Sequence, residues 1–255
     1  MFIKQRREES PRNLCISQAE NHMKKLNRNQ IKYLAIIAML VDHIGWAFVP
    51  TASAAGQLMH FIGRFTGPTM AYFLYEGFLH TRDKRKYGTR LAVFALISWI
   101  PFCSFEYGRW CLEVPVGVLY TLFLGFLAMA YCEKHENSWS ARDDLIILAI
   151  LLVSGIGDWP FFDVLWPLMF YRFRNNPKAQ WTYFWVINIV SMVVFLDPSN
   201  LLSGLYNLGG ILPGLVLQHC YSGEPGEKSF GNKWFFYVFY PLHLLVLAVI
   251  KIYLV

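Results

Sequence analysis

The chain has 255 residues, of which 55% are apolar, 17% aromatic and only 16% charged, and its mean hydropathy is positive. Soluble domains carry about 25% charged residues, and the apolar residues here fall in repeated long runs, which argues against a soluble fold. The net charge of +6 lies at the ends of these runs, so it does not indicate a nucleic-acid-binding surface. We predict an all-α, polytopic transmembrane helical bundle.

The predicted chain has two parts. Residues 1–28 form a polar cytoplasmic tail without the apolar core of a signal peptide, and residues 29–255 form the transmembrane domain. About nine spans are predicted, at residues 30–49, 57–80, 91–103, 116–132, 145–156, 161–171, 180–196, 201–219 and 233–255. The segments 145–156 and 161–171 are too short to cross upright, so they are either two tilted short spans or a re-entrant hairpin.

Positive charges orient these spans. The tail and the predicted inner loops hold nearly all Lys and Arg residues, whereas the predicted outer loops hold only Arg109. By the positive-inside rule, the N-terminus lies in the cytoplasm and the C-terminus outside the cell membrane.

Cysteine positions agree with this orientation. Cys103 and Cys111 fall at the predicted outer surface, where they either form a disulfide or remain free thiols. No Cys/His cluster has the spacing of a zinc site, and no nucleotide-binding or serine-hydrolase motif occurs. We therefore expect no metal site.

Ionisable residues inside the first span are the main functional signal. Each costs about 2.5–3.5 kcal/mol at the centre of a spanning helix, so such residues usually serve a function. Lys32 and His43 are eleven residues apart, which places them on nearly the same helix face, about 16 Å apart along the axis. Asp42, next to His43, is predicted to pair with Arg64 of the second span, leaving His43 to face a cavity as a general base.

Other polar groups at depth have two interpretations. Each is either a helix-packing group or a site residue: His60, Glu76, His243 and Asn207. The Asp42–Arg64 pair is likewise either structural or part of a site.

Three stretches carry a family resemblance: IKYLAIIAMLVDHIG, then FIGRFTGPTMAYFLYEGFLHTRDKRKYGTRLAVFALISWIPF, then YVFYPLHLLVL near the C-terminus. Together they resemble the TraX family, membrane proteins named for the enzyme that N-acetylates the N-terminus of conjugative F-type pilin. TraX proteins resemble distant members of the integral-membrane acyltransferase superfamily, whose first helix has a basic residue, ten residues and a His. Lys32 and His43 match that spacing. The chain departs from the family at 98–103, where SWIPFC replaces a frequent SEIPFD.

The resemblance implies that 29–255 is an acyltransferase-like domain. It would move acetyl from cytoplasmic acetyl-CoA to an amine or hydroxyl of an unidentified acceptor, such as a pilin N-terminus or a cell-surface glycan. His43 would act as the base, oriented by Asp42 and Arg64. The cations expected near the acetyl-CoA phosphates are Lys32, Arg82, Lys84 and Arg85.

Two other function classes remain open at this stage. A small-solute transporter would also explain polar residues at depth and the interrupted segment 145–171. A membrane scaffold or assembly factor would explain a large apolar bundle with few site residues.

Overall fold

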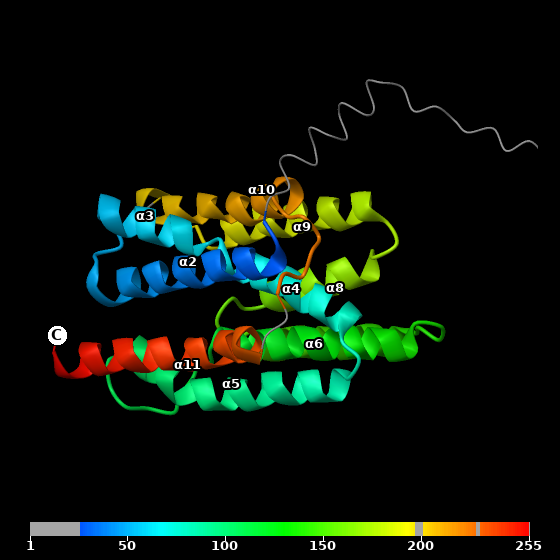
Figure 1. Ribbon diagram of the computed structural model, residues 1–255, viewed down its shortest axis with the longest axis horizontal. Helices are drawn as coiled ribbons and strands as arrows, with labels where there is room; N and C mark the ends of the chain where they lie inside the picture. The colour runs from blue at the N-terminus through cyan, green and yellow to red at the C-terminus, as the bar shows by residue number, and fades with distance from the viewer. Residues whose placement is uncertain (1–25, 197–200, 228–229, 255) are drawn as a thin grey trace, which may run out of the picture.

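The computed structural model describes residues 26–196, 201–227 and 230–254, so most of the predicted polar tail falls outside it. Its elements, labelled as in Figure 1, are α2 (Arg28–Phe48), α3 (Ala54–Gly63), α4 (Thr66–His80), α5 (Lys84–Tyr107), α6 (Val118–His135), α7 (Ala141–Ser154), α8 (Phe162–Arg172), α9 (Pro177–Val194), the 3-10 helix η1 (Leu201–Gly210), α10 (Ile211–His219) and α11 (Phe230–Tyr253). Within the described residues all these elements are helical, which confirms the predicted all-α class.

The helices lie side by side along the long axis of the molecule (Figure 1). Helix α5 packs between α6 and α11, and α2 packs on α3, α4 and α11. The short helix α8 is central, in contact with α4, α6, α7 and α9. Its side chains are buried on several faces, with Val164 and Trp166 fully inaccessible. A helix that is mostly apolar on all its faces is suited to such a core position.

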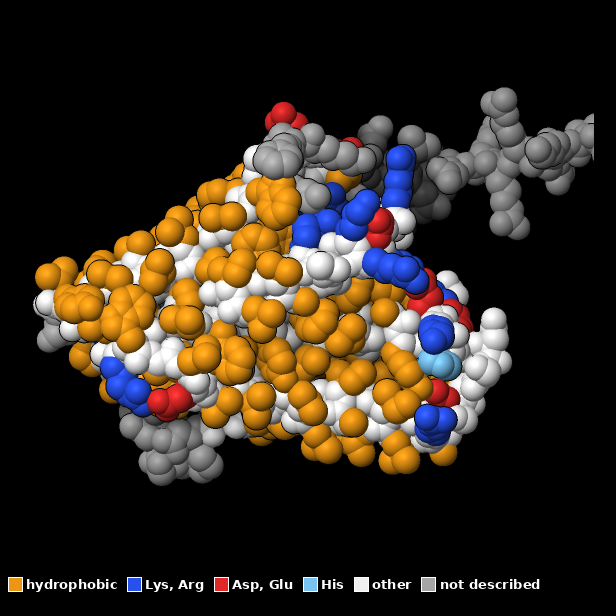
Figure 2. Space-filling view, turned by 90° about the horizontal axis from the view of Figure 1, so that it is seen from below, with side chains coloured by type: hydrophobic (Ala, Val, Ile, Leu, Met, Phe, Trp, Pro, Cys, Tyr) orange, Lys and Arg blue, Asp and Glu red, His pale blue; other side chains and the backbone are white. Residues whose placement is uncertain are grey.

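Apolar side chains cover most of the face seen in Figure 2, and most of the Lys and Arg residues visible there lie at one end. Large exposed hydrophobic residues include Leu34, Ile37, Leu96, Ile97, Leu148, Leu152, Val186, Ile189, Leu242 and Val246. Three described helical segments are long and apolar enough to cross a membrane, at Arg28–Phe48, Lys84–Tyr107 and Trp234–Tyr253. An apolar surface of this extent suits a lipid environment, so the protein is a membrane protein, while the nine-span count stays a prediction.

The predicted second span, 57–80, is divided in two. Helix α3 ends at Gly63 and α4 begins at Thr66. Pro68 has no N–H to donate to the Arg64 carbonyl, which interrupts the helical hydrogen-bond pattern. The Thr66 hydroxyl instead donates to the Ala35 carbonyl on α2, at 3.0 Å.

The third span is longer than predicted. Residues 84–90, expected in a loop, form the first turns of α5, because the Asp83 carboxylate accepts a hydrogen bond from the Lys86 N–H at 2.9 Å and caps the helix. The helix also continues through Pro101 to Tyr107. Four basic residues expected in a loop are therefore held on a helix: Lys84, Arg85, Lys86 and Arg90.

The short pair α7 and α8 forms a hairpin. Its turn docks on Val116, whose N–H donates to the Ile156 carbonyl at 3.0 Å and whose carbonyl accepts from the Asp158 N–H at 2.7 Å. The turn therefore lies beside the α5–α6 connection, whereas the α8–α9 connection lies at the opposite end of the bundle (Figure 1). The choice between two short spans and a re-entrant hairpin stays a prediction.

The connection after α5 is closed by a disulfide between Cys103 and Cys111, whose Cα atoms are 5.9 Å apart. Of the two alternatives left by the sequence, the disulfide is the one that the structure has. An ion pair between Arg109 and Glu113, at 2.7 Å, lies in the same connection. Both features order a loop at the predicted outer surface.

We expect Gly209→Ala to lower the stability of the protein by roughly 1–3 kcal/mol, because a Cβ at Gly209 would collide with the Phe61 carbonyl of α3. The matched control is Gly210→Ala, whose Cβ would meet only the flexible Met192 side chain. Thermal unfolding of the purified proteins in detergent measures both. Equal melting temperatures for the two variants would contradict the packing of η1 on α3.

We expect a membrane-impermeant maleimide to label Ala52→Cys on intact cells, because Ala52 is exposed in the α2–α3 turn on the predicted outer side. Asn137→Cys, exposed in the α6–α7 connection, should be labelled only after the membrane is opened. Labelling of Asn137→Cys on intact cells would reverse the predicted orientation.

Candidate active site

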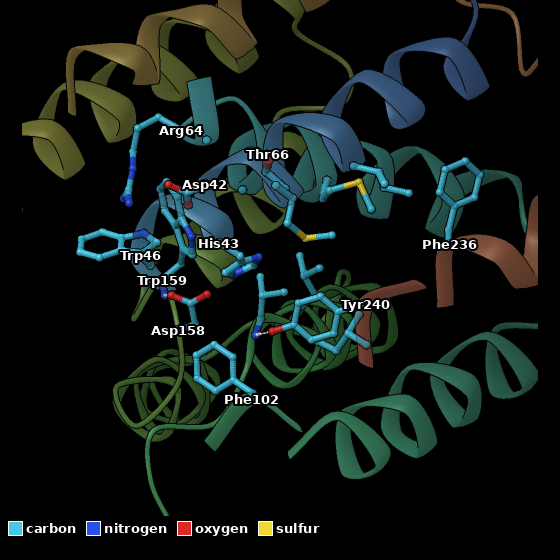
Figure 3. A pocket seen from close by; sticks show the side chains of 18 of the residues that line it. Asp42, His43, Trp46, Arg64, Thr66, Phe102, Asp158, Trp159, Phe236 and Tyr240 are labelled. Carbon is cyan, nitrogen blue, oxygen red and sulfur yellow. Dashed lines mark hydrogen bonds between the residues drawn. The ribbon is translucent and has the colours of Figure 1, made fainter. Parts of the chain in front are cut away.

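Two adjoining cavities lie inside the bundle. The first, here called the histidine cavity, has a volume of about 270 Å³ and is lined by His43, Asp42 and Arg64 among others (Figure 3). The second, the cationic cavity, has a volume of about 600 Å³ and is lined by Arg28 and Lys32 among others. Four apolar residues line both cavities: Met70, Leu119, Leu122 and Phe236. The histidine cavity and the cationic cavity therefore adjoin each other at these four side chains.

His43 is held from one side. Its Nδ1 lies 3.0 Å from Nε2 of His243 on α11, and both side chains are more than nine-tenths buried. Its Nε2 has no hydrogen-bond partner among the described residues, and the ring lines the histidine cavity (Figure 3). An imidazole with one nitrogen anchored and one available is the arrangement that general base catalysis requires. The expectation that His43 faces a cavity is confirmed.

Asp42 pairs with His60, and the predicted Asp42–Arg64 pair is wrong. Oδ1 of Asp42 lies 2.7 Å from Nδ1 of His60, whose ring packs on Trp46 at 4.0 Å between centroids. A Cβ at Gly63 would collide with the Asp42 carboxylate, so a glycine is needed for α3 to approach α2 this closely.

Arg64 turns elsewhere because α3 ends just before it. Its guanidinium lies 4.6 Å from the ring centroid of Trp159 and 4.9 Å from that of Tyr206. Its Nε is buried without a hydrogen-bond partner in the described part of the chain. Arg64 therefore lines the histidine cavity as a cation without a carboxylate partner there.

Two more carboxylates line the histidine cavity, Asp158 and Glu106. The α7–α8 turn carries Asp158, whose Oδ1 accepts from the Trp159 N–H at 3.0 Å. Neither was predicted as a site residue. The signal for Asp158 was its place in a Gly-Asp-Trp-Pro turn between two short apolar segments, whereas nothing in the sequence indicated that Glu106 lies near His43. With Asp42, these side chains make the cavity suited to a cationic group.

The cationic cavity gathers three positive side chains, Arg28 and Lys32 of α2 and Arg90 of α5, and its lining also includes His80, Glu76 and Glu227. Arg28 lies 3.7 Å from Glu76, which also accepts a hydrogen bond from the Tyr221 hydroxyl at 2.7 Å. Lys32 forms no ion pair with any described residue.

The Nζ atom of Lys32 lies 5.1 Å from the ring centroid of Phe236. A half-buried ammonium without a carboxylate partner favours an anionic ligand.

Three of the cations predicted to bind acetyl-CoA line neither cavity. Lys84 pairs with Glu133 of α6, while Arg82 and Arg85 are exposed. Because α5 begins at Lys84, residues 84–90 lie on a helix and point in different directions. Of the basic residues in this segment, Arg90 is the one that lines the cationic cavity. Of the four predicted cations, the structure brings only Lys32 into the cationic cavity, and it adds Arg28 and Arg90.

The remaining polar candidates are packing or anchoring groups. Asn207 donates to the Phe195 and Gly204 carbonyls, at 3.1 Å each, and so connects η1 to the end of α9. Glu76 connects α2, α4 and the segment after α10. His60 contacts Asp42, and His243 contacts His43.

Comparison with known proteins agrees with the resemblance found in the sequence. The chain matches the TraX protein family over residues 27–251. The probable fimbrial assembly protein FimC, serogroup H1, of Dichelobacter nodosus is 31% identical over 238 residues, which cover 88% of this chain and 96% of that protein. The uncharacterized protein RP591 of Rickettsia prowazekii (strain Madrid E) is 23% identical over 202 residues, 64% of this chain and 77% of that protein.

No solved structure matches the chain significantly. The family match spans nearly the whole chain, from the start of α2 to the end of α11. This chain therefore belongs to the TraX family.

Proposed function

We propose that this protein is a membrane acetyltransferase that uses acetyl-CoA as donor and His43 as general base. The observation that carries the proposal is the unpartnered Nε2 of His43 in a cavity adjoining one that holds the unpaired Lys32. A base next to an anion-binding space is what transfer from a phosphate-bearing thioester requires. Family membership supports the same activity.

The cationic cavity would hold the phosphates of the donor. Arg28, Lys32 and Arg90 provide three positive side chains there, and phosphate oxygens accept strong hydrogen bonds from such groups. The apolar arm of the donor would pass the four side chains shared by both cavities. The rise of an α-helix separates Lys32 and His43 by about 16 Å, so the thioester would lie at depth while the phosphates stay near the inner end.

His43 would then remove the proton from the attacking amine or hydroxyl. A bond forms between the acceptor atom and the acetyl carbon, and the carbon–sulfur bond breaks. The proton taken by Nε2 of His43 passes to the sulfur of the leaving CoA, so the base is regenerated. Arg64, whose Nε lacks a partner in the described chain, is the cation in this lining that would stabilise negative charge on the carbonyl oxygen.

The carboxylates of the histidine cavity favour an amine acceptor over an anionic glycan. Asp42, Glu106 and Asp158 face the same space, and carboxylates attract an ammonium group before it is deprotonated. The name of the Dichelobacter relative refers to fimbrial assembly, which makes the N-terminal amine of a pilin subunit the first acceptor to test. With the predicted membrane orientation, this acceptor would lie on the outer side of the membrane.

One observation favours a second candidate function. The Dichelobacter relative is named as an assembly protein, so a non-enzymatic role in building a surface fibre is the alternative. In that role neither cavity would need a ligand, and substitution of His43 would not change fibre assembly.

We expect His43→Gln to lower acetyl transfer about 10²- to 10⁴-fold, because general base catalysis contributes that much. The assay uses the detergent-purified protein, labelled acetyl-CoA and a peptide that mimics a pilin N-terminus, with acetylated peptide measured by mass spectrometry. The control is His135→Gln, because His135 bonds only its own helix at the Tyr131 carbonyl. Full activity in His43→Gln would reject the proposed base.

We expect Lys32→Gln and Arg90→Gln each to weaken acetyl-CoA binding about tenfold or more, because a lost charge-assisted hydrogen bond costs about 1.5–3 kcal/mol. Calorimetry on the purified protein measures the dissociation constant. Lys86→Gln is the matched control on the same helix, since Lys86 is exposed and pairs with Asp83 at 3.3 Å. Equal losses in all three variants would show that general charge, and not this cavity, attracts the donor.

A further inference from the structure

We infer that His243 is a positioning residue that holds His43 in one tautomer, with the proton on Nδ1 and the lone pair on Nε2. The inference rests on the proposed function for its catalytic meaning. The arrangement itself rests on two hydrogen bonds of His243, one to the Phe239 carbonyl within α11 and one to His43 of α2.

The Phe239 carbonyl sets the direction of both hydrogen bonds. It lies 2.8 Å from Nδ1 of His243, and a carbonyl only accepts, so Nδ1 of His243 carries a proton. In a neutral ring the other nitrogen, Nε2, is then an acceptor. Nδ1 of His43, 3.0 Å away, must be the donor in this pair. Nε2 of His43 is therefore left with its lone pair.

Aromatic packing keeps both rings in this geometry. The Phe239 ring stacks on His243 with centroids 4.9 Å apart and an interplanar angle of 14°. The Phe105 ring meets His43 edge-on, at 5.3 Å and 84°. Both imidazoles are thus confined on their faces as well as by hydrogen bonds, which leaves little freedom for either ring to turn over.

Besides a backbone hydrogen bond to Met39, one turn earlier on α2, His43 has no other partner of this kind among the described side chains. Asp42 is its sequence neighbour, but the Asp42 carboxylate is occupied by His60. Orientation of a catalytic imidazole through its second nitrogen is required for activity, since the wrong tautomer presents a proton where a lone pair is needed. His243 provides this orientation with a neutral ring, and it also accepts a hydrogen bond from the imidazolium that forms when Nε2 takes up a proton.

The first test compares His243→Leu with His243→Gln. Leu removes the acceptor, whereas the Gln side-chain oxygen can reach the position of Nε2. We expect His243→Leu to lower kcat about 100-fold, with KM for acetyl-CoA within about twofold of the parent, because supporting residues that orient a reactive imidazole have effects of about 10–100-fold. His243→Gln should regain activity to within about tenfold of the parent. Full kcat in His243→Leu would overturn the inference, and so would equal losses in both variants.

The second test does not depend on activity. Nitrogen NMR of histidine-labelled protein in detergent distinguishes protonated from unprotonated ring nitrogens, and His43→Gln identifies the His43 signals. We expect an unprotonated Nε2 on His43 in the parent protein and a mixture of tautomers in His243→Leu. A protonated Nε2 in the parent protein would overturn the inference. The expected tautomer in a protein that transfers no acetyl would support the inference and reject the proposed function.

Discussion

A polar side chain inside a membrane bundle must find its partner within the protein, because lipid offers none. Much of the interior follows from this constraint. The carboxylate of Asp42 faces His60, and the ring of His43 faces His243. Each pair joins α2 to a different neighbour, α3 in one case and α11 in the other. Helix α2 is therefore held between α3 and α11 by the same residues that form the candidate site.

This pairing leaves a small set of polar atoms without protein partners, and they mark where a ligand would bind. Nε2 of His43 faces the histidine cavity, Nε of Arg64 is buried without a hydrogen-bond partner in the described chain, and Lys32 lines the cationic cavity without an ion pair there. In the proposed mechanism, His43 and Arg64 lie at the reactive end of the donor and Lys32 lies near its phosphates. That separation suits a donor with a charged head and a reactive end, and suits a structural scaffold less well.

Local backbone features make the site possible. The interruption between α3 and α4 turns Arg64 away from Asp42, and Gly63 allows the carboxylate of Asp42 to lie against α3. The α7–α8 turn, anchored on Val116, brings Asp158 to the same cavity. Each feature interrupts a helix or shortens one, so the site lies where the bundle departs from regular long spans.

The helical membrane class and the shared helix face of Lys32 and His43 follow from the sequence alone. Each follows from composition or from spacing along one element, which helical period and hydropathy describe well. Only the tertiary structure decided that Asp42 meets His60 and that His43 meets a residue 200 positions away. The helical period assigns a side chain to a face of its own helix. The residue that it meets on that face depends on how the helices pack, and this packing is a property of the whole chain.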